Sequence, residues 1–351
     1  MTPKNRLKID PDGLKKILII RLRRIGDIVM TTPAIHHLRR TFPHAEISYV
    51  VEFPYADLLS GHPDLDQVLE LPPRAGLSRF TSLIQRIRKG NYDAAVDFHG
   101  GPRAAWITLL SGARWKIGYK VKYRHFIYHS RLSRSPETGP VHSVENHINL
   151  AALLGGQKTN IPRLRIASPQ IQEHRKIETF IQNSGLSRQK LVTIHVGAGN
   201  RFRDWGEANM IQLCRELNAL PETSVVMVGA GEETAAAERI SGRSRSNRNK
   251  IYSLAGRLNL RELAALIERS RVFVGPDSGP MHIAAATETP IVACFGPTLP
   301  AHFAPWRSRH TILQTQIDCR PCRQRNCVHG DFRCIRSIPP EKVFRACLKY
   351  L

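Results

Sequence analysis

Acidic residues are scarce in this sequence, and it lacks the segments that would anchor it in a membrane. Its 351 residues include 29 Asp and Glu against 52 Lys and Arg, a formal net charge of +23. No apolar run approaches the roughly 18–20 residues of a membrane-spanning helix, and residues 1–13 lack the apolar core of a signal peptide. We therefore expect a cytoplasmic protein whose basic surplus favours a polyanionic partner: nucleic acid, an anionic membrane face or a phosphorylated substrate.

Two familiar phosphate-binding signatures are also missing. The first predicted strand, residues 16–20, is followed by neither the Gly-x-Gly-x-x-Gly fingerprint nor a Walker A loop. This disfavours nicotinamide or flavin binding, and with it a nucleotide-sugar epimerase or dehydrogenase. No second carboxylate is obviously paired with Asp27, the acid beyond this strand, which argues against a hydrolase that uses an acid/base pair.

Apolar runs and amphipathic segments alternate along the chain, which is typical of an α/β protein with parallel sheets. The length favours two domains. The pattern weakens after residue 156 and restarts near 191, so we place the junction within 158–188 and assign residues 1–165 and 166–351 to two Rossmann-like, doubly wound domains. Such domains facing each other create a cleft at the carboxyl ends of both sheets. The predicted strands are residues 16–20, 45–52, 67–71, 92–98, 115–119, 191–197, 223–230, 271–275 and 290–296.

A strand, a tight turn and a helix start follow one another in residues 274–286, VGPDSGPMHIAAA. Asp277 or Ser278 could simply cap the helix, which is worth about 1 kcal/mol. A helix N-terminus is also an anion site, and Gly279 permits close approach to the backbone. A diphosphate is then the natural ligand. The N–H groups available to it belong to Ser278, Gly279, Met281 and His282, since Pro280 has none.

The segment 195–207, HVGAGNRFRDWGE, repeats this arrangement at the first strand of the second domain. Gly197 and Gly199 open a turn, and Arg201 and Arg203 follow it. Arginine beside a glycine turn suits phosphate oxygens through forked hydrogen bonds, although a solvated basic loop is the alternative. Gly229 follows the next strand of the same domain.

Asp27 lies in residues 23–35, RRIGDIVMTTPAI, at the end of the first strand. From the residues alone it is a helix cap or an ion-pair partner of Arg23 or Arg24. A carboxylate in the cleft could alternatively act as a general base toward a hydroxyl nucleophile.

Residues 112–134 combine basic and aromatic side chains and contain no acid. This composition suits single-stranded nucleic acid, a phosphorylated saccharide or a lipid headgroup. A solvated loop over half-buried aromatics is the alternative. The basic residues are Arg114, Lys116, Lys120, Lys122, Arg124, Arg131 and Arg134.

Four of the seven cysteines crowd into one segment before the last predicted helix, residues 339–351. Their spacing is Cys-x2-Cys-x4-Cys-x6-Cys, shorter than in common zinc fingers. A structural zinc and reduced thiols or an isolation-dependent disulfide are the alternatives, and none is expected to be catalytic. These residues are Cys319, Cys322, Cys327 and Cys334.

In combination these segments resemble the heptosyltransferases of lipopolysaccharide core synthesis, glycosyltransferase family nine. The resemblance covers nearly the whole chain. It is carried by the sequences GDIVMTTPAI (26–35), KIGY (116–119), VENHINLAALLG (144–155), VGPDSGPMHIAAA (274–286) and PIVACFGPT (290–298), by GAG with a following tryptophan, and by the four cysteines.

The resemblance implies the GT-B fold and an inverting, metal-independent glycosyltransferase. The donor would be ADP-L-glycero-β-D-manno-heptose, bound by the second domain through the turn from Asp277 to His282. Asp27 matches the aspartate of the family's Gly-Asp motif, whose implied role is base toward the acceptor hydroxyl. Many relatives have a lysine at the place of Arg203, so the positive charge is kept while its geometry differs.

The acceptor implied by the resemblance is the Kdo and heptose inner core of lipopolysaccharide, which would meet the first domain. Its candidate partners there are Arg23, Arg24, Lys120, Lys122 and Arg124, and Asp277, Gly197, Gly199 and Gly229 would lie near the donor's sugar or nucleotide. An enzyme of this kind would contact the cytoplasmic face of the inner membrane. A core glycosyltransferase with a different nucleotide sugar and, in another class, a nucleic-acid-binding protein are the rival hypotheses.

Overall fold

The computed structural model describes residues 13–73, 76–134, 139–158, 160–197, 199–244 and 251–351. The chain divides into two compact units, Met1–Ser168 and Pro169–Leu351, called unit 1 and unit 2 below. The unit boundary follows the boundary suggested by sequence, 165/166, by three residues. Backbone N–H groups of Arg165 and Ala167 donate to the Thr32 hydroxyl and to the Leu58 carbonyl, which ties this stretch to unit 1.

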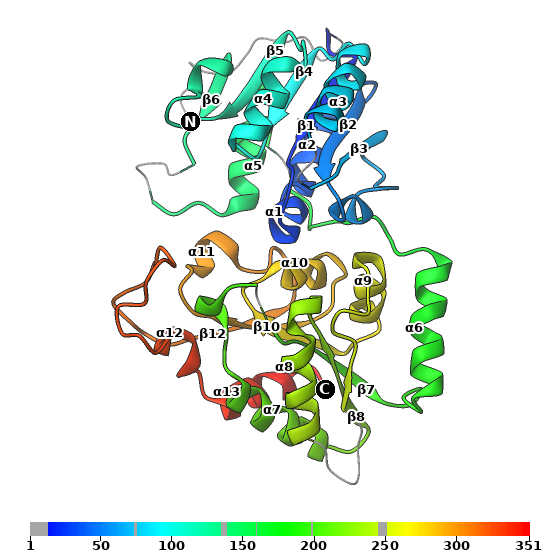
Figure 1. Cartoon of the computed structure of the whole chain (residues 1–351), viewed down its shortest axis with the longest axis vertical. Helices are drawn as coiled ribbons and strands as arrows, with labels where there is room; N and C mark the ends of the chain where they lie inside the picture. Colours follow the sequence, from blue (N-terminus) through cyan, green and yellow to red (C-terminus); the bar gives the residue numbers. More distant parts are fainter. Residues whose placement is uncertain (1–12, 74–75, 135–138, 159, 198, 245–250) are drawn as a thin grey trace. The chain divides into compact units, whose positions relative to one another are not determined.

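Unit 1 is a parallel sheet with helices on both faces (Figure 1). Its strands run in the order β3-β2-β1-β4-β5-β6. Helices α3 and α4 pack on one face, where Leu83, Ile87 and Ile107 join the buried strand residues, and α2 packs against α5. The elements are β1 (Lys16–Ile20), α1 (Ile25–Val29), α2 (Thr32–Thr41), β2 (Glu46–Glu52), the 3-10 helix η3 (Tyr55–Leu58), β3 (Gln67–Leu71), α3 (Leu77–Lys89), β4 (Ala94–Asp97), α4 (Pro102–Leu110), β5 (Trp115–Tyr119), η4 (His125–Ile127), β6 (Ser130–Leu132) and α5 (Ser143–Ala151).

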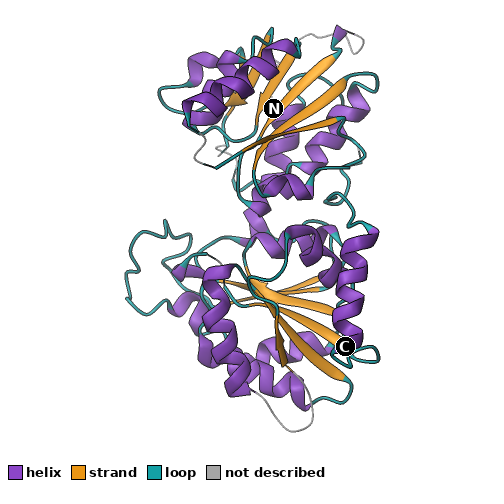
Figure 2. Ribbon diagram, turned by 45° about the vertical axis from the view of Figure 1, so that its right-hand side comes forward, coloured by secondary structure: helices purple, strands orange, loops and turns teal. Residues whose placement is uncertain are grey.

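Unit 2 repeats this plan with the order β12-β11-β10-β7-β8-β9 (Figure 2). Helices α7, α8, α12 and α13 share one core with its strands, while α6 and α10 pack against α9. The elements are α6 (Ile171–Asn183), β7 (Lys190–His195), η5 (Arg201–Arg203), α7 (Glu207–Ala219), β8 (Thr223–Val228), η6 (Gly231–Glu233), α8 (Thr234–Ser244), β9 (Ile251–Ser253), α9 (Leu260–Glu268), β10 (Val272–Pro276), α10 (Gly279–Ala286), β11 (Ile291–Phe295), α11 (Pro300–Phe303), β12 (His310–Gln314), α12 (Arg333–Arg336) and α13 (Pro340–Leu348).

Counted within each unit, the two strand orders are identical, and both are the Rossmann order 3-2-1-4-5-6. The direction of the strand order reverses between β1 and β4 in unit 1 and between β7 and β10 in unit 2. In such sheets ligands bind beyond the carboxyl ends of the strands at this switch point. The predicted α/β class with two doubly wound domains is therefore confirmed, and the topology itself indicates where to look for a site in each unit.

The segment 21–27 resembles a turn in sequence, but its last residues are helical because α1 begins at Ile25. Helix α6 lies within 158–188, the stretch in which the sequence places the domain junction. Helix α6 has a capping box between Gln170 and Glu173, whose signal is weak in sequence because glutamine stands at the N-cap. Within the described residues, no helix is long and apolar enough to cross a bilayer.

Candidate functional site

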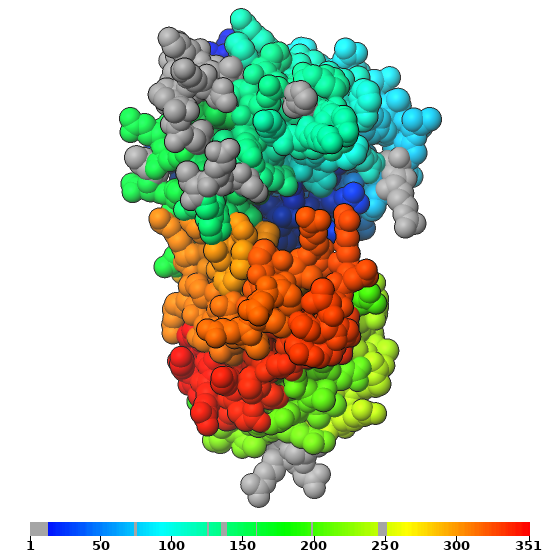
Figure 3. All heavy atoms as spheres, turned by 90° about the vertical axis from the view of Figure 1, so that its left-hand side faces the viewer, coloured from blue at the N-terminus to red at the C-terminus, as the bar shows by residue number. Residues whose placement is uncertain are grey.

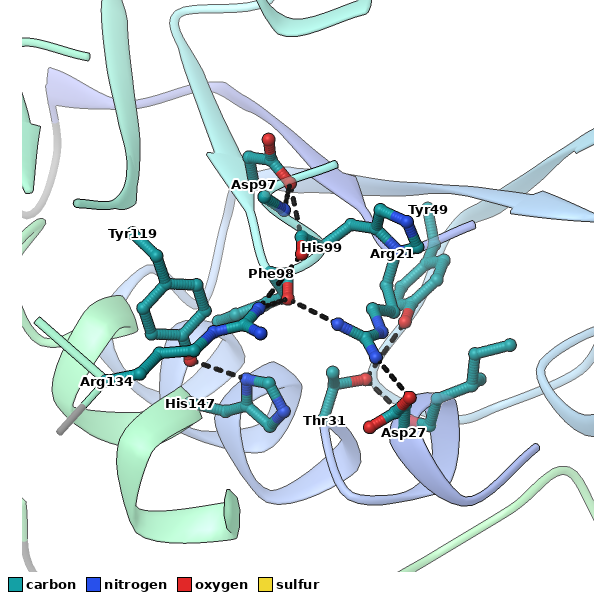
Figure 4. A network of polar contacts seen from close by, with 12 residues as sticks. Arg21, Asp27, Thr31, Tyr49, Asp97, Phe98, His99, Tyr119, Arg134 and His147 are labelled. Carbon is teal, nitrogen blue, oxygen red and sulfur yellow. Dashed lines mark hydrogen bonds and ion pairs between the residues drawn. The ribbon is translucent and has the colours of Figure 1, made fainter. Parts of the chain in front are cut away.

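Asp27 lies in the first turn of α1, just beyond the carboxyl end of β1 and at the switch point of unit 1 (Figure 4). Its Oδ2 atom pairs with Nη2 of Arg21 at 2.5 Å, and its side chain is 28% exposed. Across the described residues, its other oxygen forms no hydrogen bond. The prediction from sequence that Asp27 pairs with Arg23 or Arg24 is therefore wrong. Asp27 presents one open carboxylate oxygen while a guanidinium holds the other.

Arg21 is buried and holds two strand ends together. Its Nη1 donates to the Phe98 carbonyl at 2.8 Å, beyond β4, while its Nη2 holds Asp27. The guanidinium of Arg134 donates to the same carbonyl and lies 4.1 Å from the centroid of the Tyr119 ring (Figure 4). Two cations thus converge on one carbonyl beside Asp27. Because the buried Arg21 guanidinium also donates to a backbone carbonyl, it fixes the position of the Asp27 carboxylate.

A neutral histidine completes this part of the site. Burial, with the guanidinium groups of Arg21 and Arg23 nearby, lowers the pKa of His99 to about 4. The Nδ1 atom of His99 is buried without a hydrogen-bond partner in the described structure.

The turn that contains His99 is held by Asp97, which accepts hydrogen bonds from the N–H groups of His99 and Gly100 and from the Tyr128 hydroxyl. Burial raises the pKa of Asp97. Asp97 therefore shapes the turn and does not face a ligand.

Arg23 and Arg24 are exposed and lie between β1 and α1. Arg24 is the N-cap of α1 with φ of 73°, a backbone conformation that non-glycine residues rarely adopt. Such strain at the entry to α1 is a feature that clusters at functional sites. It accompanies the turn that brings Asp27 back over the strand end.

The basic segment 112–134 divides into buried and exposed side chains. Tyr119 and Tyr128 are buried, whereas Tyr123 and Phe126 are exposed. Lys120 and Lys122 are exposed, and Lys122 lies 5.0 Å from the centroid of the Tyr123 ring. Arg124 is half-buried, and its guanidinium reaches the Gly100 carbonyl at 3.4 Å. Of the acceptor candidates in this segment, Arg124 is therefore the one joined to the turn beyond β4.

In unit 2 the turn Asp277–His282 joins β10 to α10 as expected, but the Ser278 side chain does not cap the helix. Ser278 is the N-cap residue without a side-chain capping bond, and its hydroxyl lies 3.1 Å from Nδ1 of His195. The Asp277 carboxylate accepts from the Thr298 hydroxyl at 2.7 Å. Capping by the Ser278 side chain is therefore wrong. The first N–H groups of α10, at Gly279 and Met281, have no acceptor within their own helix, as at any helix start.

Arg203 brings the two predicted donor turns together. Its Nη1 donates to the Asp277 carbonyl at 2.9 Å and lies 3.4 Å from the Asp277 carboxylate. Its Nε donates to the side chain of Gln324 at 3.1 Å. Arg201, in contrast, is exposed and lies over the rings of Phe202 and Phe332. Arg203 is thus fixed at the switch point, and Arg201 extends beside it.

The glycine turns of unit 2 enclose a carboxylate of the chain itself. A Cβ atom on Gly197 would lie 1.6 Å from Oε1 of Glu233, and one on Gly229 would lie 2.7 Å from its Oε2. Glu233 also accepts from the N–H groups of Gly199 and Ala230. His195, whose pKa burial lowers to about 4, lies between Glu233 and Ser278, with its Nε2 atom 3.7 Å from Glu233.

The cysteine-rich segment lies against this site although it is distant in sequence. Gln324, between the second and third cysteines, accepts from both Asn200 and Arg203. Figure 3 shows the chain that follows β11, in orange, spread over the surface of unit 2. All seven cysteines are unpaired. In the parts of the chain that the structure describes, no three His, Cys, Asp or Glu side chains gather as metal ligands.

An Asp-x-Asp pair in unit 1, Asp64 and Asp66, also has other partners. Asp64 lies 3.1 Å from Nδ1 of His36, and Asp66 binds Arg39 and the N–H group of Ile47. Both precede β3, so they lie at the amino end of a strand, away from the switch point.

Sequence reasoning missed Arg21, His99, His195 and Glu233. Arg21 directly follows a buried strand, so its position at the strand's carboxyl end was a usable signal. The role of Glu233 has no local signal, because the glycines that accommodate it lie 4 and 36 residues earlier in the chain.

Residues 80–332 match the model of a known family, "Glycosyltransferase family 9 (heptosyltransferase)". The chain is 26% identical to Lipopolysaccharide heptosyltransferase 3 of Escherichia coli over 292 residues, which cover 81% of this chain and 84% of that protein.

Solved structures agree with this match. The glycosyl transferase family 9 protein of Veillonella parvula has a TM-score of 0.88 and 21% identity, covering 99% of both chains. The E. coli ADP-heptose LPS heptosyltransferase II has a TM-score of 0.79 and 24% identity, covering 95% of this chain and 98% of that one. These likenesses confirm the GT-B fold expected from sequence.

Proposed function

Because this chain belongs to glycosyltransferase family 9, the heptosyltransferases, we propose that it transfers L-glycero-D-manno-heptose from its ADP-activated form to the Kdo and heptose inner core of lipopolysaccharide. The transfer is inverting and needs no metal ion. The observation that carries this proposal is the open carboxylate oxygen of Asp27 at the switch point of unit 1. The similar E. coli enzyme is named an ADP-heptose LPS heptosyltransferase, which supports this choice of donor.

Asp27 acts as the general base. The acceptor hydroxyl oxygen attacks the anomeric carbon of the donor from the face opposite ADP, and its proton passes to the open oxygen of Asp27. The bond from the anomeric carbon to the diphosphate breaks, and ADP leaves with the electron pair. Arg21 holds the other carboxylate oxygen, so the base keeps one orientation throughout.

The basic surroundings of Asp27 suit an anionic acceptor. Arg23 and Arg24 are exposed beside α1, and Arg124 is joined to the turn beyond β4. Lys120 and Lys122 extend the positive charge along the same segment. Carboxylate and phosphate groups of a lipopolysaccharide core match guanidinium and ammonium groups through charge-assisted hydrogen bonds.

Unit 2 supplies the donor side of the reaction. Negative charge develops on the diphosphate as the bond breaks, and the N–H groups of Gly279 and Met281, with His282 in the same helix turn, stabilise it. Arg203 adds a fixed positive charge. Asp277, Gly197, Gly199 and Gly229 line the vicinity of the nucleotide and its sugar, where Glu233 lies.

No step of this mechanism involves a metal ion. The described aspartates of the Asp-x-Asp sequence, Asp64 and Asp66, bind His36 and Arg39 away from the site. In this mechanism the cysteine-rich segment contributes only Gln324, which accepts a hydrogen bond from Arg203. Elemental analysis of the purified protein tests separately for the structural zinc suggested by the four cysteines. The acceptor implies contact with the cytoplasmic face of the inner membrane, to which each nearby Lys or Arg adds about 1 kcal/mol of attraction.

The test is ADP release from ADP-heptose mixed with heptose-deficient lipopolysaccharide, with native protein and with Asp27→Ala. We expect acceptor-dependent release that collapses in the variant. Equal release from both proteins would refute the role of Asp27 while retaining the transferase. No release with ADP-heptose, but release from a UDP-linked sugar, would instead favour a different core glycosyltransferase.

A further inference from the structure

Among the described residues, the outer face of α4 is apolar and exposed. Ala104, Ala105 and Ile107 of this helix are buried in unit 1. On the other side, Trp106, Leu109 and Leu110 are 55%, 37% and 36% exposed. These three positions are spaced i, i+3 and i+4, so they form one stripe along the helix. A helix that is apolar all round is normally buried on every side. The stripe therefore needs an external partner.

The neighbouring 3-10 helix enlarges this apolar area. Helix α4 contacts η4, and Ala105 packs with Ile127 and Tyr128 beneath the surface. From the same short helix, Phe126 points outward and is 72% exposed, and nearby Tyr123 is 75% exposed. We call the set Trp106, Leu109, Leu110, Tyr123 and Phe126 the α4–η4 surface.

The chain segment that carries this surface has charged residues of one sign only. Residues 101–134, which include all five members, contain no Asp or Glu but eight Lys and Arg. Lys122 lies over the Tyr123 ring, and Arg114 lies over the Trp115 ring at 5.3 Å. Exposed aromatic and aliphatic side chains mixed with cations fit the interface of a bilayer that contains anionic lipids.

We infer that the α4–η4 surface is the site where this protein docks onto an anionic bilayer. The rings of Trp106, Tyr123 and Phe126 lie at headgroup depth, and the surrounding Lys and Arg contact anionic headgroups. A second copy of the chain fits less well, because pairing this surface with itself would bring two acid-free basic segments together. This assignment rests on the proposed function in one respect, since the acceptor of that reaction is carried by a lipid.

Vesicle flotation of the full-length protein tests the surface without measuring activity. The vesicles are phosphatidylcholine alone or with 30% phosphatidylglycerol. The double variant Trp106→Ala/Phe126→Ala should lower partition into the anionic vesicles by about tenfold or more. Ile171→Ala/Val328→Ala, which removes even more exposed apolar residues of unit 2 (78% and 76%), should bind like the native protein.

The changed residues are exposed, and thermal unfolding confirms that each variant is folded. Native-like vesicle binding by the Trp106→Ala/Phe126→Ala variant would overturn the inference. So would a change of oligomeric state in that variant by light scattering, which would assign the surface to a second copy.

Transfer to a short, lipid-free acceptor separates this inference from the proposed function. The Trp106→Ala/Phe126→Ala variant should keep native activity there and lose it only when the acceptor is embedded in vesicles. Absence of transfer by the native protein would instead contradict the proposed function, while the vesicle-binding result would still decide the docking surface.

Discussion

The two units have the same strand order, and each has its candidate site at the equivalent switch point of its own sheet. The chemical groups that form the two sites nevertheless differ. Unit 1 uses charged side chains, with Asp27 held by the buried Arg21. Unit 2 uses a helix start and glycine turns, and its carboxylates are enclosed by hydrogen bonds. The shared topology therefore determines where a ligand meets the sheet, and the residues after each strand determine the chemistry.

The two aspartate–arginine pairs show this difference most directly. Asp27 lies 2.5 Å from Arg21 and keeps an open oxygen, with a side chain that is 28% exposed. Asp277 lies 3.4 Å from Arg203, is buried, and accepts from Thr298. An open, partly exposed carboxylate can receive a proton from a substrate. A buried carboxylate already accepting a hydrogen bond instead positions the turn that contains it.

Replacing the two aspartates should produce the largest difference between the units. In Asp27→Asn, kcat should fall by about 10²–10⁴-fold, the usual contribution of a general base, with ADP affinity unchanged. In Asp277→Asn, the thermal midpoint and ADP affinity should fall while measurable turnover remains. Steady-state kinetics and calorimetry with ADP distinguish the two results. Loss of ADP binding in Asp27→Asn would contradict the division of roles.

Acid should weaken unit 1 more than unit 2. Burial lowers the pKa of His62 and His99 in unit 1 to about 4 and that of His147 well below its usual value, and it lowers the pKa of His195 in unit 2 to about 4. The unfolded chain binds protons at these sites below about pH 6.5, whereas the folded chain does so only at lower pH, near 4 for His62, His99 and His195. Their stabilisation is therefore complete above pH 6.5 and is lost as the pH falls from 6.5 toward 4.

For His62 and His195 this loss is about 3 kcal/mol each. Hydrogen exchange followed by mass spectrometry at pH 7 and pH 5, after correction for intrinsic rates, reports the units separately. We expect unit 1 to lose more protection, and His62→Gln to reduce that loss. Greater loss in unit 2 would show that other groups control its acid response.

Arg203 should matter more for the donor than Arg201. Arg203→Ala removes a positive charge fixed at the turn and should weaken ADP binding by about 10–100-fold, the range of a charged hydrogen bond. Arg203→Lys should recover part of the lost ADP affinity. Arg201→Ala is the matched control and should lower ADP affinity less, because the Arg201 guanidinium lies over aromatic rings. Titration calorimetry with ADP gives all three values, and an equal loss in Arg201→Ala would refute the distinction.

The smallest effect is expected at Ser278. Ser278→Ala removes the contact with His195 and should lower the free energy of unfolding by about 1 kcal/mol. Chemical denaturation measures this. An additional large loss of ADP affinity would show that the hydroxyl also contacts the ligand.

The sequence predicts nine of the twelve described strands, because each of the nine is a short, largely apolar run, and 16–20 and 291–295 are examples. It misses β6 and β9, which have three residues each, and β12, which is only partly buried. It also identifies the 277–282 turn, whose strand, turn and helix lie within one continuous segment. It fails to predict the ion-pair partner of Asp27, which is Arg21 and not Arg23 or Arg24, although these two are nearer in sequence. The orientation of each side chain after the strand, and not its distance in sequence, decides which groups meet. It fails again at Gln324, since contact with Arg203 depends on the path of a long loop.

Each described hydrophobic cluster draws its residues from a single unit, and each unit has its own switch point. The chain can therefore be regarded as two exchangeable cassettes joined near Ser168 and Pro169. Under the proposed function, evolution could change the activated sugar by altering the second cassette while keeping the Asp27 carboxylate of the first. A protein engineer could make the same exchange by fusing residues 1–168 to the second half of a relative.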